Sequence, residues 1–177
     1  PDTPHSILYI NSVPNIGGAE ASLIELVTHL DRRRYNPILL TMEAGPLADA
    51  FHQIDVPVFY LSFPFFSRKR PWIYWLEIAS ILQLIKKPQI KIVHENCDRA
   101  VPHAVLAGKL ARVPVVCYIH DMERAWYLPR DVRYLNRCEQ IIADSEATAR
   151  YCLDAGMDPE RMRTIYECFE MDRYLAA

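Results

Sequence analysis

Two adjacent glycines, Gly17 and Gly18, stand between an apolar run at residues 7–10 and a helical pattern at residues 19–30. Such a pair is expected where the backbone turns tightly or where another group comes close to it. A loop that leads into a helix also points backbone N–H groups and the helix dipole toward an anion such as a phosphate. The pair matches neither the Gly-x-Gly-x-x-Gly fingerprint nor a P-loop. A plain strand-to-helix turn is the alternative interpretation.

A second candidate, His120, follows an apolar run at residues 114–119 and precedes Asp121. A histidine at the end of a strand can bind phosphate, polarise an oxygen or move a proton near neutral pH. The alternative is a histidine that bonds to loop backbone while Asp121 caps the next helix. Ser145 and Glu146 follow another short apolar run, and Ser145 is expected to cap the helix that begins there.

Further polar residues, Glu95 and Asn96, follow the apolar run at residues 90–94. Together with His94 and Asp98, Glu95 could suggest a metal site. Neighbouring residues of a strand point to opposite faces, however, so the sequence predicts no metal ion here.

Short apolar runs alternate with helical patterns along the whole chain. Continuous apolar strands are typical of a parallel sheet covered on both faces, so the pattern predicts a doubly wound, mostly parallel, three-layer α/β fold that is Rossmann-like. In such sheets ligands bind outside the carboxyl ends of the strands, where these candidate residues converge. Strands are expected at residues 7–10, 37–42, 56–61, 90–94, 114–119, 140–143 and 162–166, and helices at 19–30, 46–53, 72–87, 100–110 and 145–155.

Length and composition narrow the class of protein. The chain has 177 residues, a formal net charge of −2 and five cysteines without a Cys-x-x-Cys pair. These values indicate one well-packed domain with free thiols, and they do not suggest a nucleic-acid partner. No signal peptide is expected, and the apolar segment at residues 72–85 is too short to span a bilayer, so a cytoplasmic protein is predicted.

An unusual stretch at residues 59–75 combines aromatic and basic side chains. It could dip into an anionic membrane interface, which would place the protein peripherally at the inner face of a membrane. It could also simply pack a loop against the helix behind it. The residues that would make the membrane contact are Phe65, Phe66, Arg68, Lys69, Arg70 and Trp72.

Several short motifs follow one another in a distinctive order over nearly the whole chain. They are Ile7-Leu8-Tyr9-Ile10, Gly17-Gly18-Ala19-Glu20, Ala44-Gly45-Pro46-Leu47, Val93-His94, Tyr118-Ile119-His120-Asp121 and Ala143-Asp144-Ser145-Glu146-Ala147-Thr148-Ala149. Each motif is loose, but the ordered set is fairly specific. It resembles the N-terminal domain of the retaining family-4 glycosyltransferases, which have the GT-B fold of two domains.

The resemblance assigns roles to the candidate residues. It implies that Gly17 and Gly18 face the cleft between the two domains, where the donor phosphate and the acceptor approach the backbone. It places His120 near the transferred sugar as the catalytic candidate, in a polar or electrostatic role rather than a nucleophilic one. The substrate would be a nucleotide-diphosphate sugar, with no metal or other cofactor. The acceptor-binding candidates are Asn15, Glu20, Glu95, Asn96, Asp121, Ser145 and Glu146.

Two departures from the family pattern bear on function. Glu167 and Cys168 stand where the family commonly has an Asn-Gly turn, and a left-handed turn there would strain Cys168. The chain also ends at Ala177, where a donor-binding domain would begin. Residues 1–177 are therefore expected to be the acceptor-side domain of a hexosyltransferase-like enzyme of polysaccharide biosynthesis. That enzyme would transfer sugar to a carbohydrate or lipid-linked acceptor, and the domain would be inactive alone. The alternatives are a non-catalytic module that binds a sugar, nucleotide or protein, and a sugar-nucleotide epimerase.

Overall fold

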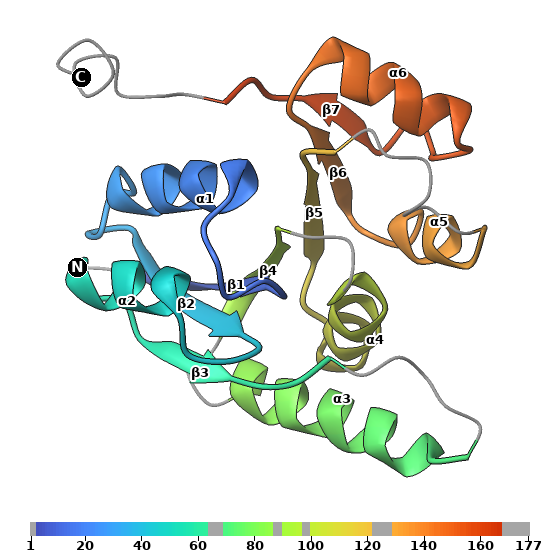
Figure 1. The fold of residues 1–177 in the computed structure, drawn as a ribbon. Helices are drawn as coiled ribbons and strands as arrows, with labels where there is room; N and C mark the ends of the chain where they lie inside the picture. The colour runs from blue at the N-terminus through green and yellow to red at the C-terminus, as the bar shows by residue number, and fades with distance from the viewer. Residues whose placement is uncertain (1–2, 64–68, 87–89, 97–99, 122–128, 168–177) are drawn as a thin grey trace, which may run out of the picture.

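Seven parallel strands form a single sheet in the order β3-β2-β1-β4-β5-β6-β7 (Figure 1). The structure is a computed structural model that describes residues 3–63, 69–86, 90–96, 100–121 and 129–167. The strand order runs outward in both directions from the β1–β4 pair, which makes that pair the switch point of the sheet. The predicted doubly wound, Rossmann-like class is confirmed.

The strands are short and mostly buried. The two central ones place Ile10 beside Glu95 and Tyr9 beside His94 in their parallel register. The strand bounds are β1 His5–Asn11, β2 Tyr35–Thr41, β3 Val58–Tyr60, β4 Ile90–Glu95, β5 Val115–Ile119, β6 Gln140–Ala143 and β7 Met162–Thr164.

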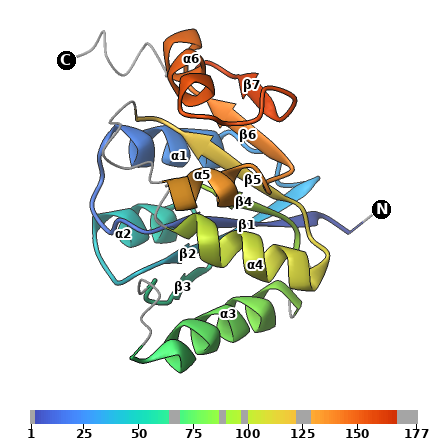
Figure 2. The same cartoon turned by 90° about the vertical axis from the view of Figure 1, so that its right-hand side faces the viewer.

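Helices cover both faces of the sheet, as Figures 1 and 2 show from two sides. One core cluster lies between helices α1 and α2 and one face of strands β1 and β2. The other cluster lies between the opposite face of the sheet and helices α3, α4, α5 and α6. The helix bounds are α1 Gly18–Thr28, α2 Pro46–Gln53, α3 Pro71–Lys86, α4 Val101–Ala111, α5 Pro129–Leu135 and α6 Glu146–Asp154.

The pleat of the strands explains the two clusters. Ile7 and Tyr9 of β1 belong to the cluster under α1 and α2, whereas Leu8 and Ile10 belong to the cluster on the other face. This alternation follows from the two-residue repeat of a strand. Because both faces are covered, both sets are apolar and the strand looks like one continuous run in the sequence.

The structure adds one helix that the sequence pattern did not predict. Helix α5 occupies seven residues between β5 and β6 and begins at a proline, which suits the first position of a helix. Its short length gives little helical periodicity, so only the tertiary structure identifies it. Strand β3 is shorter than predicted, since it pairs with β2 over only three residues.

Two further sequence-based expectations concern thiols and membranes. Cys117, Cys138 and Cys152 are buried thiols that form no disulfide, and burial raises the pKa of Cys138 and Cys152 to about 12. Cys97 and Cys168 lie outside the described residues. Among the described helices, none combines the length and the apolar character that crossing a membrane requires.

Candidate active site

Two asparagines end the central strands at the switch point. Asn11 closes β1, Asn96 directly follows β4, and both are almost completely buried. The Asn96 amide Nδ2 donates to Asn11 Oδ1 at 3.1 Å and to the backbone carbonyl oxygen of Ala19 at 3.2 Å. A backbone carbonyl can only accept, so this contact fixes the orientation of the Asn96 amide and turns its Oδ1 the other way.

Glu20 connects this pair to the glycine loop. One carboxylate oxygen accepts from Asn11 Nδ2 at 3.3 Å, and the other accepts from the Gly17 backbone N–H at 2.9 Å. The carboxylate therefore occupies the N-terminal end of α1, where negative charge is favourable. One of the N–H groups that a bound phosphate would use is thus already engaged by the protein itself.

The two glycines differ in their surroundings. Gly17 has φ −110° and ψ −160°, which other residues adopt equally well, and a Cβ there would lie 3.1 Å from Glu20 Oε2. Gly18 is the first residue of α1, and a Cβ there would meet nothing within 4 Å. A side chain at Gly17 would crowd the Glu20 carboxylate, so a close contact within the chain itself accounts for this glycine. The surroundings of Gly18 in the described structure do not require a glycine.

His120 continues the network beyond β5. Its Nε2 lies 3.1 Å from Asn96 Oδ1, and its Nδ1 lies 2.7 Å from Glu167 Oε1. The side chains of His120 and Glu167 are only 10% and 19% exposed, and the Tyr118 ring packs 4.1 Å from the His120 ring. One hydrogen-bonded network thus extends from the glycine loop through Glu20, the two asparagines and His120 to Glu167.

Asp144, at the end of β6, stands beside this histidine. His120, Asp144 and Glu167 each offer a ligand atom within 4.8 Å of the other two, a spacing that could hold a metal ion. The short contact between His120 Nδ1 and Glu167 Oε1 is a hydrogen bond, and both atoms would have to turn toward an ion to bind it. The expectation that the protein uses no metal stays a prediction.

The other predicted site residues differ in their burial and contacts. Glu95 is fully buried and accepts a bond from Cys117 Sγ at 3.1 Å, a contact between β4 and β5. Ser145 accepts from the Thr148 backbone N–H at 3.1 Å as the N-cap of α6, so its predicted capping role is confirmed. Three residues are exposed at the surface near the strand ends: Asn15, Asp121 and Glu146.

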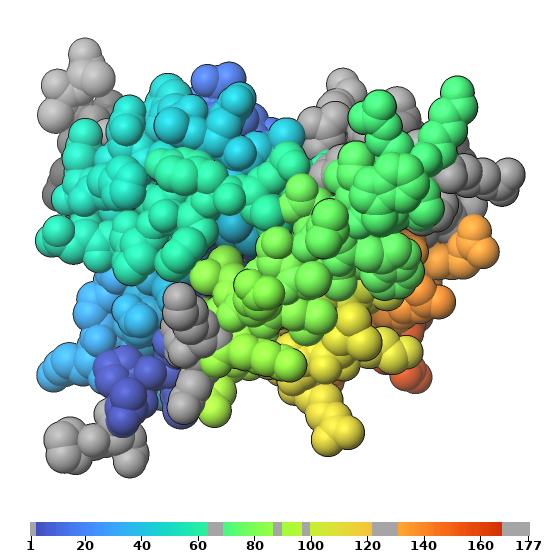
Figure 3. All heavy atoms as spheres, turned by 90° about the horizontal axis from the view of Figure 1, so that it is seen from below, coloured from blue at the N-terminus to red at the C-terminus, as the bar shows by residue number. Residues whose placement is uncertain are grey.

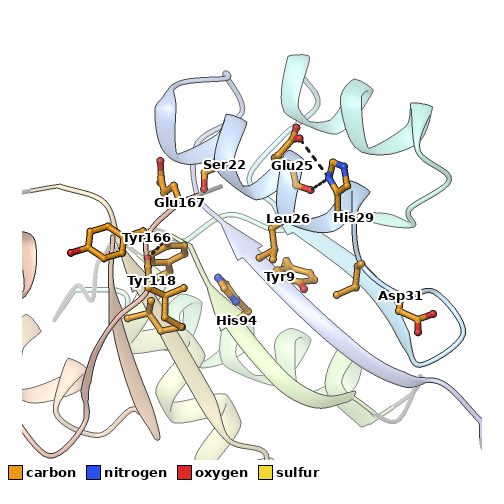
Figure 4. Close-up of a pocket in the computed structure, with 13 residues that line it drawn as sticks. Tyr9, Ser22, Glu25, Leu26, His29, Asp31, His94, Tyr118, Tyr166 and Glu167 are labelled. Atoms are coloured by element: carbon orange, nitrogen blue, oxygen red, sulfur yellow. Dashed lines mark hydrogen bonds and ion pairs between the residues drawn. The ribbon is translucent and has the colours of Figure 1, made fainter. Parts of the chain in front are cut away.

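A pocket of about 640 Å³ lies beside the network, between α1 and the face of the sheet (Figure 4). A row of rings from β1, β4 and β5 lines it, with centroids 5.0 Å apart for Tyr9 and His94 and 6.1 Å apart for His94 and Tyr118. Burial, and secondarily the charge of His120, lowers the pKa of His94 to about 4. The ring is therefore neutral at physiological pH. Its Nε2 is buried without a hydrogen-bond partner in the described part of the chain.

Sequence reasoning did not single out two residues of the network. Asn11 lies in the polar stretch after the first apolar run, where candidate residues were expected, and its signal is that it closes a continuous apolar strand at the switch point. Glu167 carried no local signal, because it stands 47 residues after His120 and meets it only in the folded chain. The sequence marked Glu167 only as a departure from the expected turn.

The sequence profile of glycosyltransferase family 4 matches residues 16–173. The chain belongs to glycosyltransferase family 4. Its resemblance to that family, inferred from ordered motifs, is confirmed. A comparison with curated protein sequences finds no match.

Solved structures show the same fold for this family-4 chain. HepE of Anabaena, solved with UDP and glucose, superposes with a TM-score of 0.78 at 22% identity, over 95% of this chain and 46% of HepE. A glycosyltransferase of Rickettsia africae gives 0.78 at 18% identity, over 98% and 45%. MurG of Acinetobacter baumannii gives 0.67 at 12% identity, over 94% and 47%. This family-4 chain therefore corresponds to one half of a GT-B fold and spans less than half the length of these proteins.

Proposed function

We propose that this chain is the acceptor-side domain of a glycosyltransferase that moves a sugar from a nucleotide-diphosphate donor to a carbohydrate or lipid-linked acceptor. The observation that carries the proposal is the network at the switch point, which brings the glycine loop and His120 into one site. The family match and the UDP- and glucose-bound HepE structure support a nucleotide-sugar substrate. The proposal includes a cytoplasmic location, where nucleotide sugars would be the donors.

The contacts of His120 suggest what it contributes. Both ring nitrogens are engaged, by Asn96 and by Glu167, so the ring is held in place rather than left available as a nucleophile. A fixed, polar or positively charged ring can stabilise charge that develops when the sugar leaves its diphosphate. We propose that the transfer retains the configuration of the sugar, as the family resemblance implies, with the acceptor placed by residues near the strand ends.

The glycine loop would serve the same reaction. The open space at Gly18 lets an acceptor or donor group approach the backbone at the start of α1, where the helix dipole is positive. The described lining of the neighbouring pocket contains no lysine or arginine. In this proposal the cationic groups that hold the diphosphate come from the other half of the enzyme, so residues 1–177 transfer no sugar alone.

The decisive experiment compares His120→Ala with His52→Ala in the complete enzyme that contains this chain. Loss of an electrostatic or acid–base group commonly costs about 10²–10⁴-fold in rate. His120→Ala should therefore lower kcat/KM by at least about 10²-fold, while His52→Ala, on the exposed surface of α2, should leave it unchanged. Normal activity of His120→Ala, or robust sugar transfer by residues 1–177 alone, would overturn the proposal.

One observation favours the second candidate, a non-catalytic binding module. The protein's own side chains occupy both nitrogens of His120, and Glu167 stands where the family pattern has asparagine. A module of this kind would bind a sugar or nucleotide in calorimetry, yet the complete polypeptide would release no nucleotide diphosphate in the presence of donor and acceptor.

A peripheral membrane contact remains a proposal on part of the aromatic-basic stretch. Trp72, Trp75 and Leu76 are 58%, 53% and 64% exposed at helical spacing on α3, and Lys69 and Arg70 precede them at the surface. Figure 3 shows the side chains of α3 lying across this surface of the molecule. Phe65, Phe66 and Arg68 lie outside the described residues.

A further inference from the structure

We propose that Glu167 is a positioning residue that holds His120 as a doubly protonated imidazolium with a fixed ring orientation. This inference rests on the proposed function only for the consequence in catalysis. The arrangement of protons follows from the contacts of this chain alone. In this proposal Glu167, which replaces the asparagine of the family pattern, serves to hold His120.

The direction of each hydrogen bond follows from a backbone atom. The Ala19 carbonyl oxygen can only accept, so the Asn96 group that faces it is the amide Nδ2. The Asn96 group that faces His120 is then Oδ1, which can only accept. His120 Nε2 must therefore carry a hydrogen and donate it to Asn96.

The other ring nitrogen faces a carboxylate oxygen at 2.7 Å. Two lone pairs would repel each other at this distance, so one proton lies between Nδ1 and Oε1. If Nδ1 holds it, the ring is an imidazolium beside a carboxylate. If Oε1 holds it, the ring is neutral with its proton on Nε2. Two features favour the first arrangement: Glu167 keeps 19% exposure to solvent, and the Asp144 carboxylate lies within 4.8 Å.

Two carboxylates lie close to the ring, and a third is joined to it only through the asparagine pair. Asp144 approaches from the end of β6, Glu167 from the segment after β7, and buried Glu20 from α1 through the asparagine pair. His94 on β4 is neutral at physiological pH, since its pKa is about 4. A proton shared between His120 and Glu167 would therefore also lie close to the Asp144 carboxylate.

The backbone delivers Glu167 to this place. The Ile165 N–H donates to the Ala143 carbonyl oxygen at 3.0 Å, which continues the β6 pairing beyond β7. The Tyr118 hydroxyl donates to the Ile165 carbonyl oxygen at 3.0 Å, and its ring packs against His120. Two residues after this double attachment, the Glu167 side chain reaches the His120 ring. Figure 4 shows Glu167 at the edge of the pocket.

The test is side-chain ¹⁵N spectroscopy of this chain at pH 7.5, because protonated and unprotonated ring nitrogens have widely separated shifts. The His120→Gln variant identifies which of the six histidines gives the signals. In the parent chain we expect both His120 nitrogens to be of the protonated type. In Glu167→Gln we expect Nδ1 to change to the unprotonated type, while Nε2, which still donates to Asn96, does not change.

A matched control is Glu139→Gln, which removes an exposed carboxylate elsewhere and should leave both nitrogens as in the parent. The backbone amide spectrum of each variant reports whether it folds. An unprotonated Nδ1 in the parent would overturn the proposal, and so would a Glu167→Gln spectrum identical to the parent. If Glu167→Gln fails to fold, the parent spectrum still decides the proton arrangement.

The complete enzyme then separates this inference from the proposed function. If both hold, Glu167→Gln lowers kcat at least tenfold with little change in KM, and Glu139→Gln leaves both constants unchanged. Unchanged kcat together with the expected ¹⁵N shifts would overturn the positioning role and leave the function intact. An inactive parent enzyme would overturn the function, while the spectroscopic result would still stand or fall by itself.

Discussion

Asn96 Oδ1 lies 3.1 Å from His120 Nε2 at the point where β4 and β5 end side by side. The two residues are 24 positions apart in the chain. Asn96 also donates hydrogen bonds to Asn11 and to the backbone of Ala19. Its amide therefore connects β1 and α1 to the histidine.

Asn96→Ala should destabilise the fold because it removes three side-chain hydrogen bonds from a residue that is 1% exposed. Each bond contributes about 1 kcal/mol net, and buried partners left unpaired cost more, so the free energy of unfolding should fall by about 2–4 kcal/mol. Urea denaturation of residues 1–177 measures it. Asn15→Ala, at an exposed position, should change it by less than about 0.5 kcal/mol. Equal effects of the two changes would contradict the network.

Gly18→Ala separates a requirement of the fold from a requirement of a ligand. A Cβ at Gly18 would meet nothing within 4 Å. Alanine stabilises a helix by up to about 1 kcal/mol relative to glycine, so the free energy of unfolding should stay the same or rise slightly. If a substrate approaches this backbone, kcat/KM of the complete enzyme should still fall at least tenfold. Full activity would remove Gly18 from the site.

Gly108→Ala is the same substitution at a crowded position, where it should destabilise the fold. Its Cβ would lie 2.4 Å from Val115 Cγ2 and 2.9 Å from the Val113 carbonyl oxygen, where α4 packs on β5. Overpacking of this kind typically costs about 1–3 kcal/mol, which thermal or urea unfolding would detect. A variant as stable as the parent would show that α4 and β5 can move apart without cost.

His94 should make stability depend on pH in a defined window. Burial lowers its pKa from 6.5 to about 4, so between these values the unfolded chain binds a proton that the folded chain does not. Stability contributed by His94 is complete above about pH 6.5, falls as the pH drops toward 4, and is constant below that, with a total loss of about 3 kcal/mol. Urea denaturation at pH 7 and pH 4.5 should show a smaller difference for His94→Phe than for the parent. The exposed control His52→Phe should behave like the parent, and an unchanged difference in His94→Phe would refute the assignment.

Binding to anionic vesicles tests the membrane contact. Removing Lys69, Arg70 and Trp72 together should weaken binding of the chain to vesicles rich in phosphatidylglycerol. Each basic residue near such a surface contributes about 1 kcal/mol, so two of them together should change affinity by roughly 30-fold. The matched control replaces Lys109, Leu110 and Arg112, which are exposed at the end of α4. If the parent does not bind, or if both triple variants bind equally, the membrane contact is wrong.

The sequence by itself determined the sheet and the family. Continuous apolar runs, such as residues 7–10, marked the buried strands because side chains on both faces of a parallel sheet are covered. Helical spacing marked most of the helices, and the ordered motifs identified the glycosyltransferase family. His120, Asn96 and Glu20 could be named as candidates because polar residues at the carboxyl ends of such strands must gather at one edge.

Only the tertiary structure decided how these residues are connected. Each of these contacts joins residues that are far apart in the chain. Glu167 contacts His120, and the Ala19 carbonyl orients the Asn96 amide. Glu95 bonds to Cys117, whereas its neighbour His94 packs against Tyr9. Neighbouring residues in the sequence do not reveal such a pair. The strand register and the path of the segment after β7 set the distance between the two residues. For the same reason Glu167 appeared in the sequence only as part of a departure that would strain Cys168, whereas the folded chain places Glu167 as the partner of the candidate histidine.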